Sequence, residues 1–141
     1  MTDAQLLQEF EKLRVLVVDD EEEIRNLVQE ILRDLGIARV HMAENGEAAW
    51  RRLRRTELEY DLVISDWLMP QMDGLELLKK MRQWGSTTPF MMLTVKVTGE
   101  AVSAAKKSGV TLYVAKPFTY GDFSRKVSAL ARQIIEGKLA V

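Results

Sequence analysis

Five short apolar runs alternate along this chain with segments that have the periodicity of amphipathic helices. The first run, Val15 to Val18, is followed by apolar residues at intervals of three and four from Ile24 to Leu35. Strands that alternate with helices predict an α/β domain with a parallel sheet. The runs are continuously apolar, which is typical of strands that helices cover on both faces. The predicted strands are residues 15–18, 37–42, 62–64, 90–93 and 111–115.

Turn and capping residues mark the ends of several predicted helices. Gly36 follows the last apolar residue of the first long helix, where a glycine commonly ends a helix. Asn45 and Asp73 precede the next two helical segments and are predicted to be their N-caps. The acids that follow the first strand, Glu21 to Glu23, are expected in a first helical turn, where they offset the helix dipole.

The chain is expected to form one domain with a short addition at each end. Leu6, Leu7 and Phe10 stand at helical spacing before the first strand and predict an extra helix. A length of 141 residues is ordinary for a single domain with its own core. The predicted parts are an N-terminal helical extension at 1–12, the domain at 13–136 and a C-terminal tail at 137–141.

The composition excludes several kinds of site. The chain has no cysteine and one histidine, His41, which rules out disulfides, thiolate metal sites and His-rich metal centres. A net charge of -1 argues against a dedicated nucleic-acid binder. We therefore interpret Arg51, Arg52, Arg54 and Arg55 as a solvated helix face. No apolar run approaches the ~18 residues of a membrane span and the N-terminus is polar, so we expect a cytoplasmic protein without membrane contact.

Polar and charged residues stand at the ends of four predicted strands. Asp19 and Asp20 follow the first, Asp66 the third and Lys116 the fifth, and Thr94 ends the fourth. Sites in open parallel sheets form outside the carboxyl ends of the strands, so these side chains are expected to converge. Three neighbouring carboxylates repel each other unless a cation joins them. Oxygen ligands without histidine or cysteine favour Mg²⁺ or Ca²⁺, and Mg²⁺ suits a small, open cluster that also takes phosphate oxygens.

Such a cluster predicts phosphoryl chemistry. An aspartate carboxylate can act as a nucleophile and form an aspartyl-phosphate. Phosphoryl transfer depends on positioning and on neutralising charge, which a divalent cation and Lys116 would supply. The hydroxyl of Thr94 would donate a hydrogen bond to a phosphoryl oxygen.

Four motifs stand at these positions in the order and spacing of a known family. They are VLVVDDE, LVISDWLMPQMDGLELL, MLT and YVAKPFT. From about Leu13 to Ile135 the chain resembles the receiver domains of response regulators, most closely the single-domain members that act in chemotaxis. The resemblance implies a flavodoxin-like, doubly wound α/β fold, with a five-stranded parallel sheet in the order 2-1-3-4-5 and five flanking helices. It also implies a phosphoacceptor signalling protein that catalyses only its own phosphorylation and dephosphorylation.

The resemblance implies a role for each site residue. Asp66 resembles the aspartate that accepts the phosphoryl group in the family, and Lys116 resembles the lysine that pairs with the phosphoryl group. Asp20 and Asp66 resemble the residues that bind Mg²⁺ directly, and Asp19 resembles the residue that binds it through water. Leu68 resembles the residue whose backbone carbonyl is a further ligand of the ion.

The resemblance also implies a switch and an output surface. Thr94 and Tyr113 are similar to the switch pair, in which the hydroxyl moves to the phosphoryl group and the ring turns inward. Val102, Tyr113 and Lys126 are the predicted partner face, and the Lys116–Pro117 bond is expected to be cis. Departures from the usual family residues at Leu68 and Val95, with charged Glu21 and Lys96 beside the site, bear on the lifetime of the phosphorylated state.

The partners expected from the resemblance are proteins. A histidine kinase would be the phosphodonor. The sequence contains no output domain, so we expect a monomer that acts through a protein contact in trans. That target could be a component of the flagellar-motor switch, or a phosphotransferase of a relay in another two-component pathway.

Three other functions are alternatives to a phosphorylated receiver. A phosphatase with an aspartyl nucleophile would need a second acid at the position of Leu68. A flavin-binding module would need a phosphate-cradling loop after the first strand, where this chain carries DDEEE. A receiver retained only as a docking adaptor would not need the complete set of site residues.

Overall fold

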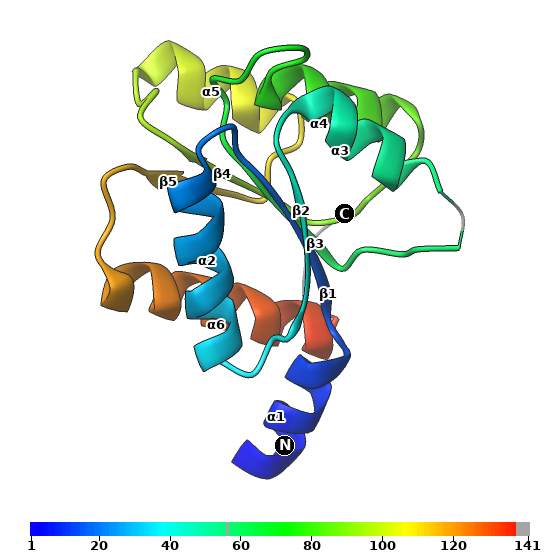
Figure 1. Cartoon of the computed structure of the whole chain (residues 1–141), viewed down its shortest axis with the longest axis vertical. Coiled ribbons are helices and arrows are strands. Elements are labelled where there is room, and N and C mark those ends of the chain that lie inside the picture. The colour runs from blue at the N-terminus through cyan, green and yellow to red at the C-terminus, as the bar shows by residue number, and fades with distance from the viewer. Residues whose placement is uncertain (56, 138–141) are drawn as a thin grey trace.

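A five-stranded parallel sheet separates two layers of helices in the computed structural model, which describes residues 1–55 and 57–137 (Figure 1). The strands follow the order β2-β1-β3-β4-β5, and each pairs in parallel with its neighbour. The predicted α/β class and strand order are therefore confirmed. The strands are β1 (Arg14–Val18), β2 (Arg39–Ala43), β3 (Leu62–Ser65), β4 (Phe90–Thr94) and β5 (Leu112–Ala115).

Helices cover both faces of the sheet (Figure 1). The residues of α2 and α6 pack in one apolar cluster, and those of α3, α4 and α5 pack in the other. The predicted N-caps Asn45 and Asp73 accept hydrogen bonds from the N–H groups of Ala48 and Glu76. The helices are α1 (Asp3–Lys12), α2 (Glu22–Asp34), α3 (Gly46–Leu53), α4 (Gly74–Gln83), α5 (Gly99–Lys107) and α6 (Tyr120–Glu136).

Strand β1 shows why the apolar runs are continuous. Val15 and Val17 belong to the cluster beneath α2 and α6, whereas Leu16 and Val18 belong to the cluster on the opposite face. Successive side chains of a strand point to opposite faces, so a strand with two covered faces needs apolar residues at every position. This arrangement buries the middle of the sheet and leaves only the strand ends for polar chemistry.

The second strand begins later than predicted, at Arg39 rather than at Ile37. Gly36 has a φ of 95° and lies at the C-terminus of α2, and the N–H of Ile37 donates to the carbonyl of Leu32. This hydrogen bond, together with the one from Gly36 to Arg33, forms a Schellman motif. Ile37 therefore caps the helix and fills the core instead of pairing in the sheet.

The N-terminal helix α1 packs its apolar side on the sheet domain. Phe10 is buried in the same cluster as α2 and α6, while Leu7 keeps 53% of its surface exposed. The division into 1–12, 13–136 and 137–141 stays a prediction, and most of the predicted tail, 138–141, lies outside the described residues. Within the part of the chain that the structure describes, no helix has the length and apolar character needed to cross a bilayer.

Glycine begins three of the helices, and at two of them the backbone of another segment lies too close for a side chain. A Cβ at Gly46 would lie 2.2 Å from the carbonyl oxygen of Met72, whose φ of 80° places it in the left-handed region. A Cβ at Gly74 would lie 2.1 Å from the carbonyl oxygen of Asp66. At Gly99, by contrast, no atom lies within 4 Å of the added Cβ. The first two glycines therefore let α3 and α4 approach the loop after β3.

We predict that Gly46→Ala lowers the free energy of unfolding by about 1–3 kcal/mol, because the methyl group would displace the backbone at Met72. Gly99→Ala is the matched control at the same helical position, and it should change stability by less than about 1 kcal/mol or raise it slightly. Urea denaturation of both variants checks this. Equal stabilities of the two variants would contradict the close contact at Gly46.

Candidate functional site

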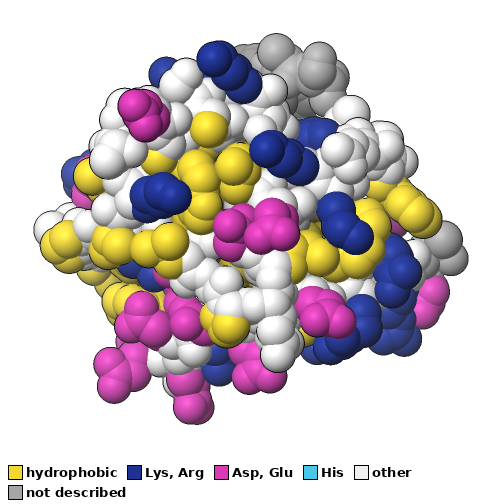
Figure 2. Space-filling model, turned by 90° about the horizontal axis from the view of Figure 1, so that it is seen from above, with side chains coloured by type: hydrophobic (Ala, Val, Ile, Leu, Met, Phe, Trp, Pro, Cys, Tyr) yellow, Lys and Arg dark blue, Asp and Glu magenta, His cyan; other side chains and the backbone are white. Residues whose placement is uncertain are grey.

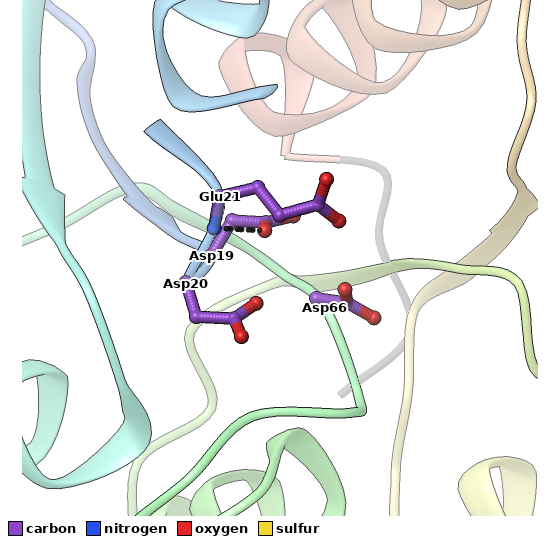
Figure 3. Close-up of side chains that lie close together, drawn as sticks. All are labelled: Asp19, Asp20, Glu21 and Asp66. Carbon is purple, nitrogen blue, oxygen red and sulfur yellow. Dashed lines mark hydrogen bonds between the residues drawn. The ribbon is translucent and has the colours of Figure 1, made fainter. Parts of the chain in front are cut away.

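Four carboxylates meet at the carboxyl ends of β1 and β3. Val18 and Ser65 are partners in the parallel register, so the residues that follow them lie side by side. Figure 3 shows that the side chains of Asp19, Asp20, Glu21 and Asp66 lie close together. One carboxylate oxygen from each lies within 4.8 Å of the others. The structure thus brings together the three predicted aspartates and adds one glutamate.

Glu21 belongs to the cluster, although the sequence placed it only beside the site and not among the metal ligands. The prediction placed it in the first turn of a helix, but α2 begins at Glu22 and Glu21 is its N-cap residue. Its side chain makes no capping hydrogen bond, and its carboxylate joins the cluster instead. The position of Glu21 directly after two site aspartates was the one feature of the sequence that could have indicated this role. Whether Glu21 lies inside the helix or before it depends on a single residue at the helix start, which sequence patterns do not fix.

Lys116 supplies one positive charge to this cluster. Its Nζ donates to Asp19 Oδ2 at 2.7 Å and to Asp66 Oδ2 at 3.0 Å, and only 8% of its side chain is exposed. The N–H of Lys116 donates to the carbonyl of Thr94, which continues the pairing of β5 with β4. Among the described residues, no ion pair involves Asp20, so one ammonium group faces an excess of carboxylates.

Burial and the neighbouring charges shift the pKa values of Asp19 and Lys116 in opposite directions. Burial raises the pKa of Asp19, although its hydrogen bonds with Lys116 and with the N–H of Glu21 act to lower that pKa. Burial by itself would lower the pKa of Lys116, but hydrogen bonds and charge from Asp19 and Asp66 outweigh it and raise that pKa. A buried carboxylate with a raised pKa gains from another cation, since the cation favours its charged form.

The Asp66 carboxylate is held in a fixed orientation. Its Oδ1 accepts hydrogen bonds from the N–H groups of Trp67 at 2.6 Å and Leu68 at 3.3 Å. Its Oδ2 faces Lys116. The missing side chain of Gly74 lets α4 press against the backbone of Asp66, and Gly74 donates its N–H to the carbonyl of Trp67. Gly74 is thus a positioning residue that the sequence alone did not reveal, because the close approach arises only when α4 packs.

Thr94 and Tyr113 are linked through Lys96. Thr94 is fully buried at the end of β4, and its hydroxyl oxygen accepts a hydrogen bond from the N–H of Lys96 at 3.2 Å. The hydroxyl of Tyr113, a half-buried residue of β5, donates to the carbonyl of Lys96. Burial and the charge of Asp66 raise the pKa of Tyr113. The Lys116–Pro117 bond on the neighbouring loop is cis.

The predicted partner face is only partly assembled. Val102 and Tyr113 line one shallow cavity of about 420 Å³ between α5 and β5. Lys126 is not among the residues that line this cavity, and on α6 it pairs with Asp122 at 3.1 Å. The structure therefore brings together two of the three predicted face residues. Figure 2 shows a surface on which acidic side chains gather along the lower left margin and basic ones along the right.

Comparison with known proteins decides the family. The sequence profile described as "Response regulator receiver domain" matches residues 15–128. The chain belongs to the response regulator receiver domain family. This receiver domain is thus a phosphoacceptor rather than an enzyme that turns over external substrates. Its cluster of Asp19, Asp20, Glu21 and Asp66 is typical of the Mg²⁺ site of receiver domains.

Relatives of this receiver domain include chemotaxis proteins. It is 32% identical over 124 residues to the chemotaxis protein CheY-3 of Vibrio cholerae, covering 86% of this chain and 94% of that protein. It is 39% identical over 109 residues to a chemotaxis protein CheY homolog of Campylobacter jejuni, covering 76% and 83% of the two chains.

Solved structures show the same fold. The receiver domain of the Francisella response regulator 1452 superposes with a TM-score of 0.79 at 30% identity, over 86% of this chain and 98% of that one. The Vibrio cholerae chemotaxis protein CheY4 gives a TM-score of 0.75 at 32% identity, over 83% and 97%.

We predict that Lys116→Met costs about 3 kcal/mol of unfolding free energy in metal-free buffer, because two buried carboxylates lose their cation. Adding Asp19→Asn to that variant should restore part of the loss, since one buried charge is removed. The matched control is Lys126→Met, which breaks an exposed pair and should cost less than about 1 kcal/mol. Urea denaturation with a chelator present measures all three, and equal costs for the two lysine variants would contradict this account.

Proposed function

We propose that this receiver domain accepts a phosphoryl group from a histidine kinase on Asp66, in the cytoplasm and in a step that needs Mg²⁺. The observation that carries the proposal is the setting of the Asp66 carboxylate. It is held by two backbone N–H groups on one oxygen and by Lys116 on the other, within a cluster of four acids. These contacts orient the Asp66 carboxylate for attack on phosphorus. Lys116 and a metal ion held by the acids would neutralise the negative charge of the phosphoryl group.

The chemistry of the donor set fits Mg²⁺. The cluster consists of carboxylate oxygens alone, and Lys116 neutralises only part of their charge. Asp20 and Asp66 would be direct ligands, together with the backbone carbonyl of Leu68, while Asp19 would act through water. Glu21 stands near enough to tune this set. When bound, the ion supplies positive charge beside the phosphoryl oxygens.

The transfer itself can be described through the residues of this chain. A carboxylate oxygen of Asp66 attacks phosphorus and forms an O–P bond, while the P–N bond to the donor histidine breaks and its electron pair stays on the imidazole. Lys116 Nζ faces the position of the incoming charge. The oxygen of Thr94 already accepts from Lys96, so its own hydrogen is available to a phosphoryl oxygen.

The hydrogen bonds of the Lys96 backbone suggest how phosphorylation of Asp66 would change the surface around Tyr113. A shift of Thr94 towards the phosphoryl group would disturb its hydrogen bond with the N–H of Lys96. The carbonyl of the same residue holds the hydroxyl of Tyr113, which lines the cavity beside Val102. Phosphorylation would thus bias the position of Tyr113 between two states and change the affinity of this face for a partner.

We predict that incubation with acetyl phosphate and Mg²⁺ adds one phosphoryl group per chain, as measured by intact mass. Asp66→Asn should abolish the adduct because it removes the nucleophile, and Asp20→Asn or a chelator should strongly reduce it. Asp122→Asn, which changes an exposed acid on α6, is the control and should leave the adduct unchanged. An adduct of full yield in Asp66→Asn would overturn the assignment of the phosphoacceptor, and no adduct with any donor would favour a docking adaptor.

The relatives support chemotaxis as the pathway, because proteins 32% and 39% identical to this chain carry that name. We propose that the output is a protein contact with a component of the flagellar-motor switch, made by the face that contains Val102, Tyr113 and Lys126. A phosphotransferase of another two-component relay is the second candidate, since the Francisella response regulator domain is as similar in structure.

We predict that phosphorylation tightens binding to the purified motor-switch component at least about fivefold, in the range usual for coupled sites. Tyr113→Ala should remove most of this gain because the ring lies on the proposed face. Tyr120→Ala, which alters an exposed tyrosine at the start of α6, is the control. Equal affinity in both states would argue against the motor switch, and phosphoryl transfer to a phosphotransferase would favour the relay.

A further inference from the structure

The segment between β4 and α5, residues 95–98, carries a lysine whose ammonium group lies on the ring of a tryptophan. Nζ of Lys96 stands 4.4 Å from the ring centroid of Trp67, within the roughly 6 Å at which an aromatic face attracts a cation. No ion pair within residues 1–55 and 57–137 involves Lys96, although four carboxylates gather at the same edge of the sheet. The indole is therefore the partner that the structure gives to this ammonium group.

Trp67 is a fixed point beside the phosphoacceptor, and only 5% of it is exposed. Its N–H donates to Asp66 Oδ1 at 2.6 Å, and its carbonyl accepts from the N–H of Gly74 at 2.8 Å. These two backbone hydrogen bonds hold the residue that carries the indole. A side chain that lies on this ring is therefore held in place relative to the Asp66 carboxylate.

The segment that carries Lys96 is otherwise weakly packed. Val95 and Val97, on either side of the lysine, keep 57% and 54% of their surface exposed. The segment belongs to neither β4 nor α5, and backbone with few buried contacts opens easily. The contact with Trp67 therefore attaches an exposed segment to the loop of the phosphoacceptor.

The backbone of the same lysine holds both members of the predicted switch pair. The N–H of Lys96 donates to the hydroxyl oxygen of Thr94 at 3.2 Å, and its carbonyl accepts from the hydroxyl of Tyr113. One residue thus connects the indole beside Asp66 with the end of β4 and with the ring on β5. A change in the position of any of these groups acts on the other two through Lys96.

We propose that the contact between Lys96 and Trp67 is a latch that holds the switch in its unphosphorylated arrangement. Lys96 is then a positioning residue for Thr94 and Tyr113. The inference rests on the proposed function, because it assigns the latch to the state that precedes phosphorylation of Asp66. A shift of Thr94 towards the phosphoryl group would draw the backbone of Lys96 with it and separate the ammonium group from the ring. Since the latch stabilises one of two states, its removal should favour the other.

A lysine beside this site has one other role open to it, as a further cation for the phosphoryl group, and the two roles have opposite consequences. If Lys96 bound the phosphoryl group, removing its charge would weaken the binding of a phosphoryl mimic. If Lys96 is a latch, the same change should tighten that binding. The geometry favours the latch, because Lys96 lies on the indole whereas Lys116 is the cation that contacts Asp66.

The test is a titration of the full chain with beryllofluoride, an unreactive mimic of the phosphoryl group, in buffer with Mg²⁺ and followed by NMR. The face of an indole shifts the protons above it upfield. The ε-methylene protons of Lys96 should therefore be shifted upfield in the unphosphorylated protein and should lose this shift when the mimic binds. Lys96→Met should bind the mimic about two- to fivefold more tightly, the factor expected for one partly exposed cation–π contact. Before any mimic is added, its Tyr113 signals should already lie closer to their mimic-bound positions.

The chain offers a matched control in a second lysine that lies on a tryptophan ring. Lys80 Nζ stands 5.5 Å from the ring centroid of Trp50, so Lys80→Met should leave the affinity for the mimic and the Tyr113 signals unchanged. Lys96→Arg should behave as the natural sequence does, because a guanidinium group also stacks on aromatic faces. Trp67→Leu, which keeps the charge of Lys96, should also tighten the mimic, and adding Lys96→Met to it should give no further tightening.

Three results would overturn the latch: equal or weaker binding of the mimic by Lys96→Met, equal effects of Lys96→Met and Lys80→Met, or Lys96 protons that are not shifted upfield or do not move when the mimic binds. With any of these, Asp66 would remain the phosphoacceptor. Absence of mimic binding would overturn the latch too, and the acetyl phosphate adduct then decides whether the proposed function falls with it.

Discussion

The repulsion among the carboxylates of Asp19, Asp20, Glu21 and Asp66 is the constraint on which the rest of this structure depends. One buried lysine offsets part of it, and burial still raises the pKa of Asp19. A protein that keeps such a cluster holds an unfavourable charge distribution that a divalent cation and a phosphoryl group can relieve together. The same electrostatic imbalance would underlie the metal binding, the phosphoryl transfer and the switching that we propose for this site.

The fold produces this charge imbalance because the register of the strands places the acids next to one another. Parallel pairing of Val18 with Ser65 places the residues after β1 and β3 side by side, and the continuation of β5 along β4 places Lys116 opposite them. Close packing at Gly46 and Gly74 then fixes the loop that follows Asp66. An apolar core on both faces of the sheet keeps the strand ends rigid, so the buried carboxylates of Asp19 and Asp66 stay close together.

The sequence by itself determined the α/β class, the five strands, most helix ends and the convergence of Asp19, Asp20, Asp66 and Lys116, because burial on both faces and the polar strand ends are written in local pattern. The strand order came from resemblance, and the comparisons confirmed the family. Tertiary structure alone decided that Glu21 joins the cluster, that Ile37 caps a helix and that Gly74 supports Asp66. Each of these depends on how separate elements approach one another in space, and such distances are set by packing rather than by the order of residues along the chain.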